Sequence, residues 1–162
     1  MSTSAPSSDP PRIVTRPAFV VVGLRIRATP MSPEIPRLWQ GFAPRIGEVP
    51  DLAEPRVSYG VMGGFDPQQQ RFDYMAGVSV TRTSRLPAGM VAWELPAQTY
   101  AVFDATLRHI GEAFGHIFGT WLPTAAFSQA DAPYFERYGA SFDPADAGST
   151  IEIFIPVHAK SV

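Results

Sequence analysis

The chain has 162 residues, 45% of them hydrophobic and 17% charged, which is the size and composition of one globular domain. It carries 13 basic and 15 acidic residues for a net charge of −2, without a basic stripe. We therefore expect no direct binding to nucleic acid. The absence of cysteine excludes a disulfide framework and thiol-ligated metals, and it fits a cytoplasmic location.

The N-terminal end is rich in serine and proline over residues 1–11 and lacks the charged and apolar regions of a signal peptide. We predict that it forms a disordered segment. No apolar run is long enough to span a bilayer, so no membrane association is expected. The sequence thus predicts one domain over residues 12–158 of a soluble, cytoplasmic protein.

The first half of the chain predicts a strand, a helix and two further strands. Residues 19–26 are apolar and β-branched, as in a buried strand. Ser32 is a predicted helix N-cap, and apolar residues at helical spacing extend the helix to about Gly47. After a break bounded by Pro50 and Pro55, two strands are predicted at 57–62 and 72–80.

The second half repeats this order. Residues 89–95 and 99–106, separated by Pro96, predict either one interrupted strand or a pair of strands. Apolar spacing from residue 110 predicts a helix that ends near Leu122 and Pro123, and strands at 134–140 and 150–157 close the unit. Tyr59-Gly60 and Tyr138-Gly139 fall at comparable places in the two halves.

This repeat predicts an α+β fold built by pseudo-two-fold duplication of a β-α-β-β unit. We expect an antiparallel sheet and two helices packed in two layers. The junction of the halves would then form a groove suited to a small molecule.

The segment 133–138 places one carboxylate among aromatic rings. In a strand Tyr134, Glu136 and Tyr138 share one face, because side chains alternate. A carboxylate beside aromatic walls can bind a lipophilic cation, or act as a catalytic acid or base if desolvation raises its pKa. The residues alone also allow a solvated strand glutamate.

Six segments that occur in order resemble the GyrI-like small-molecule-binding domain, the effector-binding module of AraC-type and MerR-type multidrug regulators. They are residues 35–42, 72–78, 86–90, 96–103, 121–123 and 135–138. The resemblance covers about residues 12–157, and it implies that Glu136 points into a ligand groove with aromatic walls. Because the domain uses up the chain, no helix-turn-helix module and no direct transcriptional role are expected.

The candidate ligand-binding residues are Glu136 and five aromatic residues: Trp39, Tyr74, Trp93, Trp121 and Tyr138. Each aromatic side chain could instead belong to the core. Trp39 lies in the apolar register of its helix, whereas Trp121 lies at a helix end, where a groove edge is expected. Trp93 alternates with apolar neighbours and could face either way.

The sequence predicts neither a metal nor another cofactor. The three histidines do not form a metal-binding motif, and the glycine-rich stretch 60–64 predicts a turn without a nucleotide-binding pattern. Asp73 and Asp104 could be secondary acids of the groove.

Three classes of function follow. The first is a stand-alone module that binds small lipophilic, cationic or aromatic ligands in drug or toxin sensing or sequestration. The alternative is a hydrolase that opens cyclopropane rings of DNA-alkylating natural products, as some members of the resembled family do. Glu136 would then be the acid or base, with Tyr138 beside it. The third is a role through a protein partner such as gyrase or a regulator.

Overall fold

The computed structural model describes residues 10–30 and 32–160, so most of the predicted disordered segment 1–11 lies outside the described residues. The first half contains β1 (Arg12–Arg16), β2 (Phe19–Ala28), α1 (Glu34–Phe42), the 3-10 helix η1 (Ala43–Glu48), β3 (Ser58–Asp66) and β4 (Arg71–Val80). The second half contains β5 (Val91–Leu95), β6 (Gln98–Thr106), η2 (Leu107–His109), α2 (Ile110–His116), the π-helical turn η3 (Ile117–Trp121), α3 (Leu122–Thr124), β7 (Phe127–Gln129), β8 (Tyr134–Tyr138) and β9 (Thr150–Ala159).

The described strands form one nine-stranded sheet in which every pair is antiparallel. The order is β1-β6-β9-β8-β3-β4-β2-β5, and β7 pairs with β9. The central neighbours β3 and β8 come from different halves, and β6-β9-β8 on one side mirrors β2-β4-β3 on the other. The predicted α+β architecture with two β-α-β-β units is therefore confirmed.

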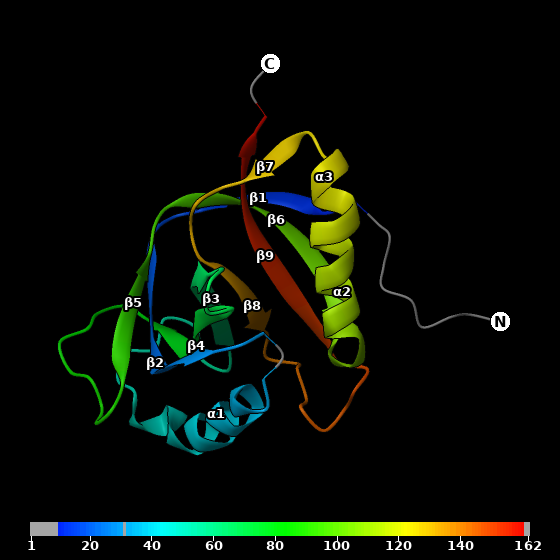
Figure 1. Ribbon diagram of the computed structural model, residues 1–162. Coiled ribbons are helices and arrows are strands. Elements are labelled where there is room, and N and C mark those ends of the chain that lie inside the picture. The colour runs from blue at the N-terminus through cyan, green and yellow to red at the C-terminus, as the bar shows by residue number, and fades with distance from the viewer. Residues whose placement is uncertain (1–9, 31, 161–162) are drawn as a thin grey trace.

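The two halves also exchange their first, short strands. β1 precedes β2 but pairs with β6, while β5 precedes β6 but pairs with β2. Only Pro17-Ala18 and Pro96-Ala97 connect each short strand to the next. Since these two-residue links join strands near opposite edges of the sheet, the sheet must curl until its edges approach each other (Figure 1).

The curled side of the sheet encloses an aromatic core. Its largest side chains are Tyr59, Tyr100, Phe135 and Phe154, and neighbouring ring centroids lie 4.6–5.6 Å apart. All of them are at most 5% exposed. This core holds the two halves together from the side opposite the helices.

Both helices cover the other face of the sheet. Ala76, Gly60, Glu136, Ile153 and Phe103 are directly paired in register from β4 across β3, β8 and β9 to β6, so they share one face. Helix α1 packs on the Ala76 side of this row, and α2 packs on the Ile153 and Phe103 side (Figure 1). Glu136 therefore lies on the helix-bearing face, between the two helices.

The structure corrects several local predictions. The first helix ends at Phe42 and continues as the 3-10 helix η1, and the short strands β1 and β7 were not predicted. The glycine-rich stretch 60–64, predicted as a turn, lies within β3. Tyr59 and Tyr138 are not equivalent, because Tyr59 pairs with Arg137 on the curled side and Tyr138 lies on the helix-bearing face. None of the described helices is long and apolar enough to cross a membrane.

Candidate functional site

Glu136 is a carboxylate buried at the centre of the sheet. It is 6% exposed and lies directly opposite Gly60 in the pairing of β3 with β8. A Cβ atom at Gly60 would lie 2.8 Å from Oε1 of Glu136 and would also run into the Tyr74 hydroxyl. The missing side chain at Gly60 thus provides the space that the carboxylate occupies.

One oxygen of this carboxylate is hydrogen-bonded to two phenols. The hydroxyls of Tyr138 and Tyr74 donate to Oε1 at 2.6 and 3.2 Å, and Trp39 Nε1 donates to the Tyr74 oxygen at 2.9 Å. An indole N–H can only donate, so Tyr74 accepts from Trp39 and uses its own proton for Glu136. Helix α1 is in this way connected to the carboxylate.

The second oxygen, Oε2, has no hydrogen-bond partner among the described residues. Within residues 10–30 and 32–160 it accepts no hydrogen bond, and no lysine or arginine forms an ion pair with Glu136. Tyr100 Oη is the sole fully buried side-chain polar atom without a partner in the described part of the chain, so Oε2 is still reached by solvent. Among the described residues the carboxylate therefore has one oxygen without a hydrogen-bond partner, on the helix-bearing face of the sheet.

Burial raises the pKa of Glu136 to about 7, although the hydrogen bonds from Tyr138 and Tyr74 act in the opposite direction. Burial, together with the nearby charge of Glu136, raises the pKa values of Tyr74 and Tyr138 well above 10. Both phenols therefore stay protonated as donors. Near neutral pH the carboxyl group itself changes readily between its neutral and charged forms.

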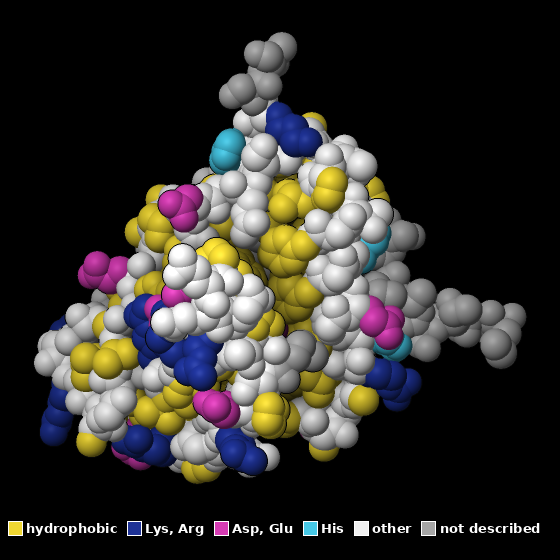
Figure 2. Space-filling model, in the orientation of Figure 1, with side chains coloured by type: hydrophobic (Ala, Val, Ile, Leu, Met, Phe, Trp, Pro, Cys, Tyr) yellow, Lys and Arg dark blue, Asp and Glu magenta, His cyan; other side chains and the backbone are white. Residues whose placement is uncertain are grey.

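Partly buried aromatic rings surround this carboxylate on the helix-bearing face. The Tyr138 ring lies 5.3 Å from that of Trp39 and 4.8 Å from that of Phe142. Two residues before Glu136 on the same face, the Tyr134 ring lies 6.2 and 5.9 Å from those of Phe114 and Phe118 of α2 and η3. A strip of hydrophobic side chains is visible beside α2 in the space-filling view (Figure 2).

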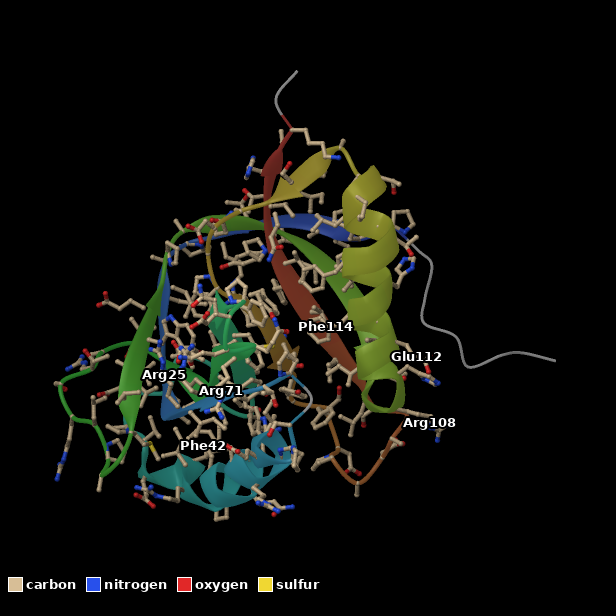
Figure 3. The ribbon with its side chains drawn as sticks, viewed as in Figure 1. Arg25, Phe42, Arg71, Arg108, Glu112 and Phe114 are labelled. Carbon is tan, nitrogen blue, oxygen red and sulfur yellow. The ribbon has the colours of Figure 1, made fainter. Side chains whose placement is uncertain are left out.

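The two sides of α2 differ. In Figure 3, Phe114 points from α2 toward the strands, whereas Glu112 on the same helix points away from them. Glu112 is exposed, and Phe114 packs against side chains of both halves. Phe114 thus helps to close the space between the halves, and Glu112 takes no part in it.

The structure brings together four of the six predicted site residues: Glu136, Tyr138, Tyr74 and Trp39. Trp93 lies on the curled side, where the guanidinium of Arg25 stands 3.9 Å from its ring centroid. Trp121 packs on Phe103, with 5.0 Å between the ring centroids, and among the described residues it makes no aromatic-ring contact or hydrogen bond with these four side chains.

Sequence reasoning left out other residues of this region. Alternation along the strand puts Tyr134 on the face of Glu136, and this is the signal that supports its inclusion in the site. Phe114 and Phe118 are four residues apart, a spacing that puts both on one side of a helix. Gly60 and Phe142 carried no signal that could have been recognised in the sequence.

Three other acidic side chains on or beside the sheet, Glu54, Asp73 and Asp104, have arginine partners. On the curled side Glu54 accepts hydrogen bonds from three side chains: Tyr59, Ser79 and Arg137. Asp73 pairs with Arg25 and Arg27, and Asp104 pairs with Arg12, so neither is an acid of the helix-bearing face. Across the described ranges, no group of three or more histidine or acidic side chains could hold a metal ion.

Comparisons with known proteins place this geometry in context. A family model described as "Cass2: Integron-associated effector binding protein" matches residues 12–157. The transcriptional regulator BrlR of Pseudomonas aeruginosa is 35% identical over 150 residues, covering 91% of this chain and 55% of the regulator. The chain thus spans about half the length of that relative.

Two solved structures share the fold. An integron cassette protein of Vibrio cholerae is similar with a TM-score of 0.64 and 22% identity, over 92% of this chain and 96% of the other. The protein SAV2435, solved bound to tetraphenylphosphonium, is similar with a TM-score of 0.68 and 16% identity, over 91% of this chain and 93% of the other. At these identities the similarity establishes the fold alone.

Proposed function

This chain belongs to the Cass2 family of integron-associated effector binding proteins, and we propose that it binds lipophilic aromatic cations between its two helices, with Glu136 as the counter-charge. Family membership confirms the resemblance to GyrI-like effector-binding domains that the sequence indicated. Sensing or sequestration of drugs or toxins is the role that such binding would serve.

The buried carboxylate of Glu136, without a cationic partner in the described residues, is the observation that carries this proposal. An isolated buried charge is costly, and a bound cation would remove that cost. The rings of Trp39 and Tyr138 can add cation–π contacts of about 0.5–2 kcal/mol each. Because such contacts depend little on the shape of the ligand, we expect broad rather than narrow specificity.

The chemistry of one similar structure supports the same ligand class. SAV2435 was solved bound to tetraphenylphosphonium, an aromatic cation, and its fold matches over almost the whole chain. In this chain we assign the counter-charge to Glu136 and the ligand contacts to Trp39 and Tyr138, while Tyr74, which is 2% exposed, holds the carboxylate through its hydroxyl. Trp93 and Trp121 lie away from that cluster and are not included.

A titration with methyltriphenylphosphonium and its neutral relative triphenylphosphine oxide tests the proposal. Quenching of tryptophan fluorescence should show saturable binding of the cation, and Glu136→Gln should weaken the cation at least about tenfold while changing the neutral compound little. Glu112→Gln, an acid on the exposed side of α2, is the matched control and should bind like the parent. Equal losses for both compounds in Glu136→Gln would show that Glu136 is not the counter-charge.

A second function is favoured by the protonation of the same residue. A carboxyl group with a pKa near 7 and one free oxygen can give or take a proton at neutral pH, as a general acid or base must. The site could then hydrolyse an electrophilic ligand such as a cyclopropane-bearing alkylating agent, with Tyr138 holding the carboxyl group. Mass spectrometry of such a compound after incubation with the protein distinguishes the two functions. Catalytic formation of product that is lost in Glu136→Gln supports a hydrolase. Quantitative recovery of the unchanged compound supports a binding protein.

A further inference from the structure

Two polar atoms of the site have no partner among the described residues. They are Oε2 of Glu136 and the hydroxyl oxygen of Tyr134. Neither is fully buried, because Tyr100 Oη is the sole fully buried unpaired side-chain atom in the described ranges. Both therefore keep some contact with solvent and an unused acceptor position, whereas Oε1 of Glu136 already accepts two hydrogen bonds.

These two atoms belong to neighbouring side chains of one surface. Tyr134 and Glu136 are two residues apart in β8 and point to the same face, so their Cα atoms lie roughly 7 Å apart. Burial and the charge of Glu136 raise the pKa of Tyr134 to about 12, which keeps its hydroxyl protonated. A phenol oxygen can still accept a hydrogen bond, so the pair offers two acceptors to an incoming cation.

The curled side of the sheet holds a cation in a comparable setting. There the guanidinium of Arg16 lies 4.3 Å from the Phe19 ring centroid, donates to the Tyr59 hydroxyl at 3.0 Å and stands 3.9 Å from Glu54. A tyrosine oxygen, a carboxylate and an aromatic ring thus already bind an N–H cation in this chain.

Resting on the proposed function, we propose that the site selects aromatic cations that carry N–H groups, namely protonated amines or amidines, over quaternary ammonium and phosphonium ions. One N–H donates to Oε2 of Glu136 and another to the Tyr134 oxygen. Tyr134 is accordingly a specificity-determining residue.

A preference for N–H cations is not the default for an aromatic pocket. A primary ammonium is more strongly hydrated than a quaternary one and exposes less apolar surface, so a pocket without acceptors favours the quaternary ion. Charge-assisted hydrogen bonds to acceptors that are already in place reverse that order. Tighter binding of the primary ammonium than of the quaternary ion would therefore indicate that the two unpaired atoms accept hydrogen bonds from the ligand.

The matched ligands are benzhydrylammonium and N,N,N-trimethylbenzhydrylammonium, which share their rings and their charge and differ in N–H groups. Both are titrated by calorimetry at about pH 8, where Glu136 is ionised. The primary ammonium should bind roughly tenfold or more tightly than the quaternary ion. Tyr134→Phe, which keeps the ring that packs on α2, should reduce this ratio several-fold without changing the affinity of the quaternary ion.

Tyr100→Phe removes an unpaired phenol oxygen on the other side of the sheet and is the control, which should leave the ratio unchanged. In Glu136→Gln the ratio of the affinity for the primary ammonium to that for the quaternary ion should also fall. Equal or tighter binding of the quaternary ion, or an unchanged ratio in Tyr134→Phe, overturns the selectivity and leaves cation binding intact. If neither ion binds, the proposed function fails with it.

Discussion

Exchange of Glu136 for glutamine keeps the size of the side chain and an acceptor oxygen for the two phenols but removes the charge that burial penalises. The pKa of Glu136 is raised from its ordinary 4.5 to about 7 in the folded protein. The folded state thus binds the proton more tightly than the unfolded chain does. The stability that this proton contributes is present at pH values below 4.5 and is lost as the pH rises to 7.

The size of the effect follows from that shift. At about 1.4 kcal/mol per pKa unit, the free energy of unfolding of the parent should fall by about 2–3 kcal/mol relative to that of Glu136→Gln between pH 5 and pH 8. Because the other carboxylates titrate in both proteins, the difference in unfolding free energy between parent and variant reports on Glu136 alone. The stability of the variant relative to the parent should therefore increase as the pH rises.

Urea unfolding of both proteins at pH 5, 6, 7 and 8 measures this difference, with Glu112→Gln as the exposed control that should show no such trend. A difference between parent and Glu136→Gln that stays constant across this pH range would refute the reasoning. It would mean that the carboxylate is solvated in the folded protein as well as it is in the unfolded chain.

Three other predictions test neighbouring features. The affinity of the parent for methyltriphenylphosphonium should fall about tenfold for each pH unit below the raised pKa of Glu136, and a flat fluorescence titration between pH 5 and pH 8 would contradict this. Gly60→Ala should destabilise the protein by roughly 1–3 kcal/mol in urea unfolding, because its Cβ enters the space of the carboxylate; Gly41→Ala, with open space around it, should be neutral or slightly stabilising. Glu54→Gln should destabilise by about 1–3 kcal/mol at neutral pH: burial raises the pKa of Glu54, but its three hydrogen bonds bring it below the ordinary value. That loss should shrink in acid as the parent is protonated, and a loss that is equal at pH 4 and pH 7 would contradict it.

Much of the architecture could be predicted from local patterns. The alternation in 134–138 predicts that Tyr134, Glu136 and Tyr138 lie on one face. In β8 these three residues do lie on one face, the helix-bearing one. The repeated order of strand, helix and two strands predicted the duplication, because each element depends on residues close together in the sequence. The repeated Pro-Ala pairs at 17–18 and 96–97 mark the links of the exchanged strands and are visible in the sequence.

Pairing and direction were decided only by the tertiary structure. Trp39 and Tyr74 are 35 residues apart and Tyr74 and Glu136 are 62 apart, yet hydrogen bonds join them in one chain of donors. No local pattern shows which strands become neighbours, and a shift of one residue in the register would turn Glu136 to the curled side. The same limit applies to Trp93, whose alternation in β5 was clear but whose face depended on pairing with β2.

The sequence by itself thus determined the two main helices, most of the strands, their duplication and the aromatic neighbours of Glu136 along its own strand, since each follows from periodicity within a few residues. The tertiary structure alone decided that this carboxylate is buried opposite a glycine, without an ion-pair partner in the described residues and with one oxygen free. The physical reason is that burial and pairing depend on strands that are distant in the sequence and meet only when the two halves join at β3 and β8.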